Sequence, residues 1–191
     1  CHIGKADQRE NLVAKTMEAF GRIDILVNNA AINPVFGPIE EVDTAIFDKI
    51  MEVNVKAPWS LSNLVLPHLK AHKKGSIINI ASVEALTPGF GLGIYSTSKA
   101  AILMLSKNQA KEWGKHGIRV NAICPGLIKT KFSAALWQNE KILGKIQKTL
   151  PSERMGMPEE MVGLACLLAS DAGGYMTGGV YTADGGYMIA G

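Results

Sequence analysis

The sequence predicts an α/β protein built on a parallel sheet that helices cover on both faces. Short runs rich in β-branched residues alternate with helical patterns of ten or more residues, and strands separated by such helices form parallel sheets. The 191 residues are 47% hydrophobic and 19% charged, an ordinary globular composition. Since no repeat, low-complexity tract or linker interrupts the pattern, we predict that residues 1–191 form a single domain.

The first half of the chain is predicted to supply one strand and three helical stretches. Residues 7–20 carry apolar side chains at helical spacing, which indicates an amphipathic helix. The β-branched run at 23–28 ends in asparagines, as a buried strand does where it runs into a loop. Two helical stretches are then expected over 43–71. A break is expected near Asn54 and Pro58, because proline lacks the amide hydrogen that a helix interior needs.

The second half repeats the alternation. Buried strands are predicted at 75–82 and 117–126, with a helix at 94–113 between them, and a Pro-Gly pair ends the later strand. Pro158 opens a further helix that runs to about residue 170, since proline suits a first helical turn. The segment VYTADGG, at 180–186, closes the chain as a last strand and turn.

Polar residues and turn formers gather at the carboxyl ends of the predicted strands. Asn28 and Asn29 follow the first strand, Ser82 ends the second, and Pro125 and Gly126 stop the third. Ligands of parallel α/β sheets bind in the crevice at these ends. We therefore expect a binding or catalytic site at this edge of the sheet.

A tyrosine and a lysine stand four residues apart at the start of the helix predicted for 94–113. At this spacing Tyr95 and Lys99 lie on the same helix face. A free phenol has a pKa of about 10, and a nearby ammonium favours its ionised form. The Ser82 hydroxyl could hold a substrate oxygen against the phenol, giving an acid/base pair for interconverting a carbonyl and an alcohol. Each feature alone is more often a capping serine or a solvated surface pair.

In combination, these residues resemble the short-chain dehydrogenase/reductase family. Ser82 precedes Tyr95 by thirteen positions, and Tyr95 and Lys99 form the Tyr-x-x-x-Lys pattern of that family. Further family motifs stand in order along essentially the whole chain: NNAA at 28–31, with Ala31 where the family has glycine, Asn54 within EVNVKAP, PGLIKT at 125–130, and ADGG at 183–186. Five motifs in the right order are a far more specific signal than the Tyr–Lys pair alone.

The resemblance implies a Rossmann-like, doubly wound parallel sheet and an oxidoreductase that uses NAD or NADP. By resemblance, Tyr95 would be the catalytic acid/base, and Ser82 would orient and polarise the substrate carbonyl. Lys99 would lower the pKa of Tyr95 and hold the nicotinamide ribose, while Asn54 would link Lys99 to solvent through an ordered water. The implied cofactor contacts are Asn28, Ala30, Tyr95, Lys99, Pro125, Gly126, Ile128 and Thr130.

Within the family, the sequence is most similar to the branch of peroxisomal-type carbonyl and retinal reductases. The opening CHIGKA, the phrase NVKAP, and PGLIKTKFS followed by Leu136 and Trp137 carry this likeness. The sequence ends in MIAG and not in the Ser-Arg-Leu-like tripeptide that serves as a peroxisomal address. We therefore do not expect the peroxisomal location of that branch.

The glycine-rich phosphate turn of the family has no counterpart in this sequence. The glycine cluster at 89–93 lies between Ser82 and Tyr95, so it is not that turn. We expect the N-terminal strand–helix units to be missing, so that this sequence is an excerpt of a longer protein and the isolated fragment is inactive. The strand at 23–28 should then form an exposed hydrophobic edge. His2 stands where many relatives have an aspartate, which makes the usual adenine contact doubtful.

Charge and ligand spacing argue against several classes of function. A net charge of +3, evenly scattered, is too small to favour nucleic acid or an anionic membrane as a partner. The three cysteines and four histidines show no metal-ligand spacing. No apolar run has the length that spans a bilayer, and no signal peptide is recognisable. We expect no metal, no nucleic-acid or membrane partner, and a reducing, cytoplasmic location.

Residues 131–150 follow the segment that, by resemblance, contacts the nicotinamide. In the family this region forms a substrate lid, and an apolar lid would suit a fairly apolar ketone or aldehyde, although an ordinary amphipathic helix on the core fits the pattern equally well. The helices at 54–71 and 94–113 correspond to those that build a four-helix dimer interface, and the final strand often makes a second contact. A homotetramer is expected, with a homodimer as the fallback. The apolar lid positions are Phe132, Leu136, Trp137, Leu143 and Ile146.

Two other functions compete with the oxidoreductase. A non-catalytic dinucleotide-fold protein would explain the missing phosphate turn, but it has no physical need for the set of Asn54, Ser82, Tyr95 and Lys99. A sugar-nucleotide epimerase or dehydratase shares the Tyr-x-x-x-Lys pattern, but it carries a larger C-terminal substrate domain. Since only 65 residues follow Gly126, we reject that reading on size.

Overall fold

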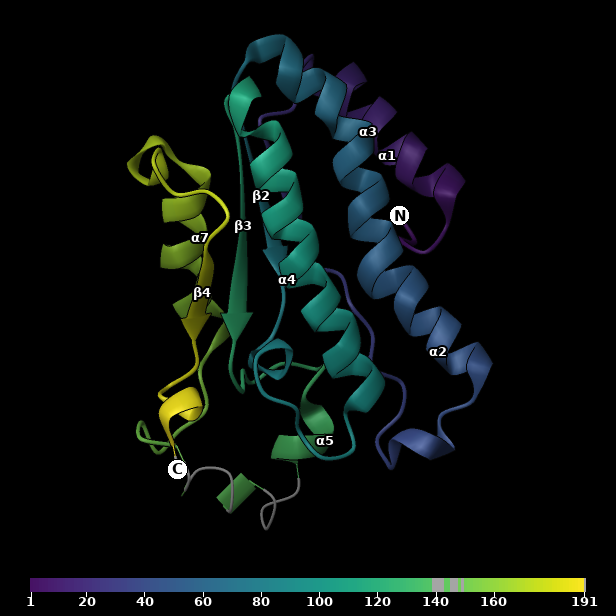
Figure 1. The fold of residues 1–191 in the computed structure, drawn as a ribbon, viewed down its shortest axis with the longest axis vertical. Coiled ribbons are helices and arrows are strands. Elements are labelled where there is room, and N and C mark those ends of the chain that lie inside the picture. The colour runs from purple at the N-terminus through teal and green to yellow at the C-terminus, as the bar shows by residue number, and fades with distance from the viewer. Residues whose placement is uncertain (139–142, 145–147, 149, 191) are drawn as a thin grey trace.

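The computed structural model describes residues 1–138, 143–144, 148 and 150–190, and within them four strands form one parallel sheet. Hydrogen bonds join the strands in chain order, with parallel pairing throughout. β2, β3 and β4 run toward the end of the molecule at which the C-terminus lies (Figure 1), and β1 runs parallel to β2. The predicted parallel α/β architecture is confirmed. The strands are β1 (Ile25–Asn28), β2 (Gly75–Ile80), β3 (Ile118–Pro125) and β4 (Val180–Ala183).

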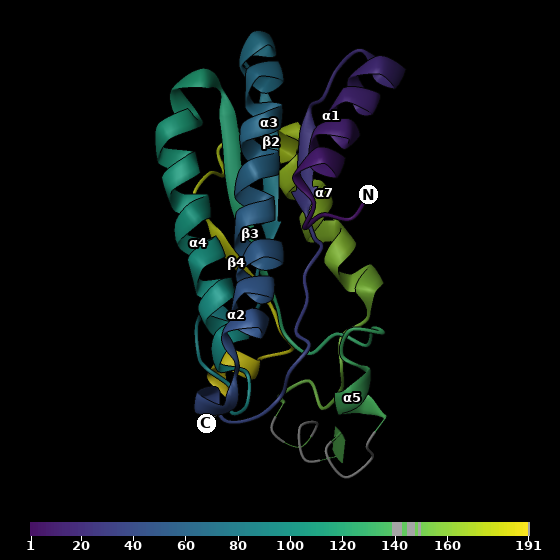
Figure 2. The same ribbon diagram turned by 90° about the vertical axis from the view of Figure 1, so that its right-hand side faces the viewer.

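Helices lie on both sides of this sheet. Figure 2 shows α4 and α7 on opposite sides of the strands, with α3 beside α4 and α1 beside α3. The strand side chains alternate accordingly: Ile77 packs among residues of α1, α3 and α4, whereas the next residue, Ile78, packs against Leu168 of α7. The helices are α1 (Ala6–Phe20), α2 (Thr44–Met51), α3 (Ala57–His72), α4 (Gly93–Trp113), α5 (Ala134–Trp137) and α7 (Val162–Ala169).

The two helical stretches predicted over 43–71 are α2 and α3, and they meet near Asn54 and Pro58 as predicted. The junction is not a gap: residues Glu52–Lys56 form a π-helical turn that joins α2 directly to α3, so the chain stays helical and widens at Asn54. Pro58 falls in the first turn of α3, directly after the π-helical turn. The helix predicted from Pro158 begins as a 3₁₀ turn (Pro158–Met161) and continues as α7.

The edge strand β1 has the exposed apolar side chains that the sequence led us to expect. β1 pairs with β2 alone, and Ile25 and Val27 are each 47% exposed. Within the part of the chain that the structure describes, no helix has the length and hydropathy to cross a bilayer. In the predicted lid, α5 follows Phe132, while residues 139–142, 145–147 and 149, which include Ile146, lie outside the described residues.

Candidate active site

Ser82 lies just beyond the carboxyl end of β2 and is almost fully buried. Its side chain caps the 3₁₀ turn Val83–Ala85, because the Ser82 Oγ accepts a hydrogen bond from the Glu84 N–H (3.1 Å). Since the Oγ is the acceptor in this bond, its own hydrogen remains available to another oxygen. The cap therefore holds the hydroxyl at the sheet edge and leaves it able to donate.

Tyr95 and Lys99 lie in the first two turns of α4, next to Ser82. The Ser82 side chain lies near enough to the Tyr95 hydroxyl to lower the pKa of the phenol. Lys99 is buried, and its Nζ donates to the backbone oxygen of Ile80 (2.8 Å) and lies 5.7 Å from the centre of the Tyr95 ring. The structure thus brings the serine, the tyrosine and the lysine together where β2 ends.

Burial, and not Lys99, has the largest effect on the acidity of Tyr95. Burial raises the pKa of Tyr95 to about 12; the Ser82 hydrogen bond lowers it, and the nearby Glu84 and Cys124 raise it. Burial also lowers the pKa of Lys99 to about 8. This differs from the expectation that Lys99 lowers the pKa of Tyr95: the ammonium is desolvated and directed at the Ile80 oxygen. At neutral pH the phenol keeps its proton.

Asn54 lies in the π-helical turn and does not contact Lys99 through its side chain. Its Oδ1 accepts from the Ile32 N–H (2.9 Å), and its Nδ2 donates to the Ile32 oxygen (2.9 Å) and to the Ser98 Oγ (3.0 Å). The amide thereby ties the loop after β1 to α4, one residue before Lys99. These hydrogen bonds hold the loop after β1 against α4. The link from Lys99 through Asn54 and a water to solvent stays a prediction.

The Asn28 side chain turns away from the cofactor edge that we predicted for it. Asn28 pairs with Asn79 across β1 and β2, and its Nδ2 donates to the Asn79 Oδ1 (2.7 Å) and to the Ser62 Oγ (3.4 Å). The Asn79 Nδ2 in turn donates to the Ser106 Oγ (2.8 Å). Because both hydrogens of the Asn28 Nδ2 are used inside the core, a cofactor contact at Asn28 would have to come from its Oδ1 acceptor or from its backbone. Ala30, two residues later, is exposed.

The segment after β3 is held in place by its own hydrogen bonds. Pro125 ends the strand, and the Gly126 N–H donates to the Ala183 oxygen (3.0 Å). A Cβ at Gly126 would lie 2.7 Å from the Cα of Asp184, so only glycine allows this approach. Farther along, the Ser133 Oγ donates to the Ile128 oxygen (2.6 Å) and the Trp137 Nε1 to the Thr130 oxygen (2.8 Å). The predicted carboxamide-binding segment is thus ordered beside the strand ends.

Three further side chains lie close to Tyr95. Phe132, already predicted in the lid, has its ring centre 5.9 Å from that of Tyr95. Glu84 and Cys124 were not predicted for the site, although both influence the Tyr95 hydroxyl. Cys124 is fully buried, whereas Cys166 in α7 is exposed. An acidic residue two positions after Ser82, in a loop that must return to Tyr95, was the signal that could have found Glu84.

The residues at this edge fit the nicotinamide end of NAD or NADP. An ammonium has three donors, and the one hydrogen bond that Lys99 makes to the described residues goes to Ile80, so donors remain for ribose hydroxyls. The segment that contains Ile128 and Thr130 leads directly to Phe132, whose ring lies beside that of Tyr95. Among the residues that the structure describes, no three potential metal ligands cluster, so the same edge shows no metal site.

Comparison with known proteins supports one family throughout the chain. The family model described as Enoyl-(Acyl carrier protein) reductase matches residues 1–188. Dehydrogenase/reductase SDR family member 4 of Oryctolagus cuniculus is 44% identical over 186 residues, which cover 97% of this chain and 72% of the relative. The protein of the same name from Homo sapiens is 41% identical, over 97% of this chain and 67% of the relative.

Solved structures give the same result. A gluconate 5-dehydrogenase from Burkholderia cenocepacia, in complex with NADP and tartrate, superposes with a TM-score of 0.95 at 29% identity, over 100% of this chain and 74% of that one. A putative NAD(P)-dependent gluconate 5-dehydrogenase from Beutenbergia cavernae with bound NADP gives 0.93 at 35% identity, over 99% and 75% of the two chains.

Proposed function

Because this chain belongs to the short-chain dehydrogenase/reductase family of NAD(P)-dependent oxidoreductases, we propose that the protein interconverts a carbonyl and a secondary alcohol, with Tyr95 as the acid/base. The observation that carries the proposal is the convergence of the Ser82 hydroxyl, the Tyr95 phenol and the buried Lys99 ammonium at one strand end. A family member that only bound partners would have no reason to bury these groups together.

The proposed reaction needs one proton at the substrate oxygen, and Tyr95 is placed to supply it. The phenol is neutral at pH 7, because burial raises the pKa of Tyr95 to about 12. In carbonyl reduction Tyr95 would donate its proton to the developing alkoxide, while Ser82 donates a hydrogen bond to the same oxygen. Bound NADH or NADPH supplies the hydride. Lys99 would hold the ribose hydroxyls and set the nicotinamide face toward the substrate.

An apolar ketone or aldehyde is the substrate class that we propose. Phe132 contacts the Tyr95 ring and is 55% exposed, so an aromatic surface lies beside the reacting hydroxyl. An apolar substituent on the carbonyl carbon would cover part of that surface and exclude water from it. On this basis we propose that the protein is a carbonyl reductase. Separately, we propose that it is located in the cytoplasm, which imaging of the tagged complete protein would test.

Substitution of the tyrosine tests the proposed function directly. In the complete protein, Tyr95→Phe should reduce NADPH-dependent reduction of an aromatic aldehyde such as 4-nitrobenzaldehyde by roughly 10²- to 10⁴-fold, because the proton donor is lost while the ring stays. Cofactor affinity, measured by the fluorescence of NADPH on binding, should stay nearly unchanged. Tyr175→Phe, on a fully exposed tyrosine, is the matched control. A Tyr95→Phe variant that kept most of its activity would refute the proposal.

The alternative, a non-catalytic dinucleotide-fold protein, is tested by cofactor binding. We propose that residues 1–191 alone bind neither NADH nor NADPH, because the glycine-rich phosphate turn is not among them. Titration of both cofactors into this chain and into the complete protein decides the matter. Binding by the complete protein alone supports the enzyme and gives its NAD or NADP preference; binding by neither supports the non-catalytic reading.

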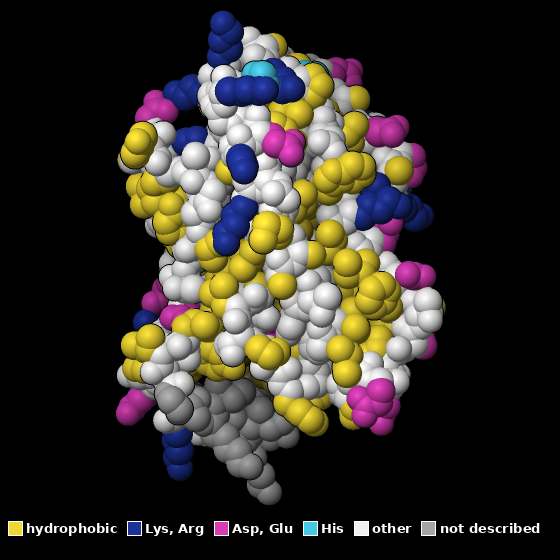
Figure 3. Space-filling model, in the orientation of Figure 1, with side chains coloured by type: hydrophobic (Ala, Val, Ile, Leu, Met, Phe, Trp, Pro, Cys, Tyr) yellow, Lys and Arg dark blue, Asp and Glu magenta, His cyan; other side chains and the backbone are white. Residues whose placement is uncertain are grey.

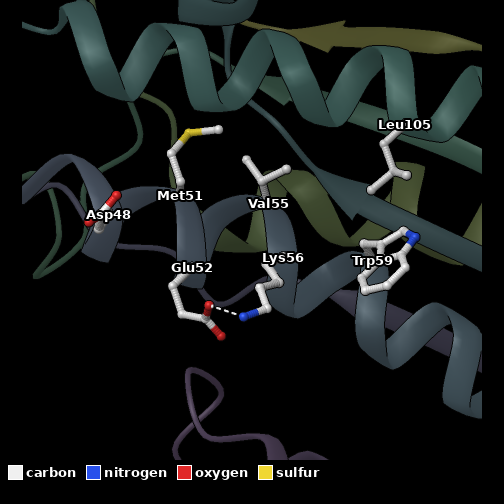
Figure 4. A pocket seen from close by; sticks show the side chains of 7 residues that line it. All are labelled: Asp48, Met51, Glu52, Val55, Lys56, Trp59 and Leu105. Carbon is white, nitrogen blue, oxygen red and sulfur yellow. Dashed lines mark ion pairs between the residues drawn. The ribbon is translucent and has the colours of Figure 1, made fainter.

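We also propose that α3 and α4 form the interface of a homodimer or homotetramer. Hydrophobic side chains gather on the face of the molecule shown in Figure 3. Trp59 in α3 and Met104 in α4 are 50% and 57% exposed. An open groove runs between α2–α3 and α4, with apolar Met51, Val55 and Leu105 across it and the Glu52–Lys56 ion pair at its rim (Figure 4). Light scattering of the Trp59→Glu variant should then show a smaller oligomer than the wild-type protein.

A further inference from the structure

Glu84 connects the two residues on which the proposed proton transfer depends. Its backbone N–H donates to the Ser82 Oγ, and its carboxylate turns back toward α4. The Glu84 Oε2 accepts from the Gly89 N–H and from the Ser96 Oγ–H (3.2 Å), and Ser96 directly follows Tyr95. One residue therefore touches the catalytic serine, the loop that follows it and the first turn of the helix that carries the tyrosine.

The loop between the two catalytic residues depends on this carboxylate. Residues 86–92 form no helix or strand, and the Glu84 Oε2 accepts the amide hydrogen at Gly89, near the middle of the loop. A Cβ at Gly89 would lie 2.6 Å from that Oε2, so a larger residue there would displace the carboxylate. A partly buried amide that loses its acceptor is unfavourable, so removal of the carboxylate should loosen the loop.

The charge of Glu84 also acts on Tyr95. The groups that face the tyrosine are Lys99 from its own helix, Cys124 from β3, and Ser82 and Glu84 from the end of β2. Glu84 is the carboxylate of this set, and a negative charge close to a phenol opposes its ionisation. The pKa of Tyr187, which faces Glu84 from the C-terminal 3₁₀ turn, is raised by burial and by the same carboxylate.

We propose that Glu84 is a positioning residue that clamps the loop between Ser82 and Tyr95 and whose charge opposes ionisation of the Tyr95 phenol. The consequence for catalysis rests on the proposed function, because the placement of Ser82 and Tyr95 matters only if they act on a substrate oxygen. Under that function, the clamp holds the two hydroxyls in the arrangement that proton transfer to the substrate needs.

Two substitutions separate the clamp from the charge. Glu84→Gln keeps an oxygen that can accept from the Gly89 N–H but removes the negative charge; Glu84→Ala removes both. Glu18→Gln, on the exposed face of α1, is the control. In the complete protein labelled with ¹³Cζ-tyrosine, the Tyr95 signal is assigned from the Tyr95→Phe variant and followed against pH by NMR. Hydrogen exchange of the Gly89 amide is measured in the same samples.

Glu84→Gln should lower the pKa of Tyr95, so that the phenol ionises at a proton concentration roughly three- to tenfold higher than in the wild type. The Gly89 amide hydrogen should still be protected from exchange. Glu84→Ala should change both the titration of Tyr95 and the exchange rate of the Gly89 amide, and Glu18→Gln should change neither. If Tyr95 titrated identically in Glu84→Gln and in the wild type, the charge role would be refuted. If Gly89 exchanged equally slowly in Glu84→Ala, the clamp would be refuted. Neither readout needs turnover, so an active Tyr95→Phe variant would refute the proposed function and leave this result intact.

Discussion

Two buried polar clusters in this protein lie within a few residues of each other in sequence and have opposite characters. In the core cluster, Asn28, Asn79 and Ser106 join β1, β2 and α4, and each amide nitrogen has an acceptor in the protein. In the site cluster, Ser82 and Lys99 keep donors beyond their bonds to the described residues. Both clusters bury polar atoms, but only the second leaves hydrogen-bonding capacity for a ligand.

This difference indicates which cluster serves stability and which serves chemistry. A buried polar group with all its partners stabilises one arrangement of the core, whereas one without them is unfavourable until a ligand supplies the missing partner. Asn28 shows how close the two roles lie: the family motif placed it at the cofactor, but its side chain belongs to the core cluster. Substitutions in the two clusters should therefore affect different measurements.

The largest effect is expected at Lys99. Lys99→Met removes the ammonium that we assign to the ribose, so kcat/KM for carbonyl reduction by the complete protein should fall by roughly 10²- to 10⁴-fold. The free energy of unfolding at pH 7 should not fall, because the variant replaces a desolvated charge with an apolar chain of similar length. Lys107→Met, at an exposed position of the same helix, is the control. A variant with normal kinetics but lower stability would place Lys99 in the core cluster instead.

The opposite pattern is expected at Asn79. Asn79→Ala removes the shorter of the two Asn28 amide bonds and the donor to the Ser106 hydroxyl, and it leaves a small cavity in the core. The free energy of unfolding should therefore fall by about 2 to 4 kcal/mol in urea titrations. Activity per folded molecule should change little. Asn108→Ala, at an exposed position of α4, should leave stability nearly unchanged. Loss of kcat without loss of stability would show that the two clusters are not separable.

The smallest effect is the dependence of stability on pH. Burial lowers the pKa of Lys99 from 10.5 to about 8, so between these values the unfolded chain binds more protons than the folded one. Stability should therefore rise with pH across this window, by up to about 3 kcal/mol in the wild type relative to Lys99→Met. Below pH 8 the folded and the unfolded chain both hold the Lys99 proton, so the free-energy cost of burying the ammonium is fully present. Tyr95, with a pKa raised to about 12, has the opposite sign and acts at higher pH. Parallel curves for the two proteins from pH 8 to 10 would contradict a buried ammonium.

The sequence predicted the order of strands and helices because hydrophobic periodicity and glycine or proline at the element ends are local signals. It also predicted that Ser82, Tyr95 and Lys99 meet, because their spacing resembled a known motif. It could not predict that Asn54 binds Ile32 and Ser98, since those contacts depend on the π-helical turn. Nor could it predict the high pKa of Tyr95, because burial depends on packing by distant segments such as the one that contains Phe132.

The π-helical turn makes a deletion at this point unlike a deletion elsewhere in the same helical run. The turn takes up one residue more than a regular α-helix would hold, and this residue widens the backbone where Asn54 reaches Ile32. Each residue of a regular α-helix rotates the chain by about 100°, so a deletion within α3 would turn everything after it by that angle. Removal of one residue at 52–56 would instead return the segment to regular α-helix, with α3 in nearly the same rotation relative to α2, and the change would fall on the contacts of Asn54.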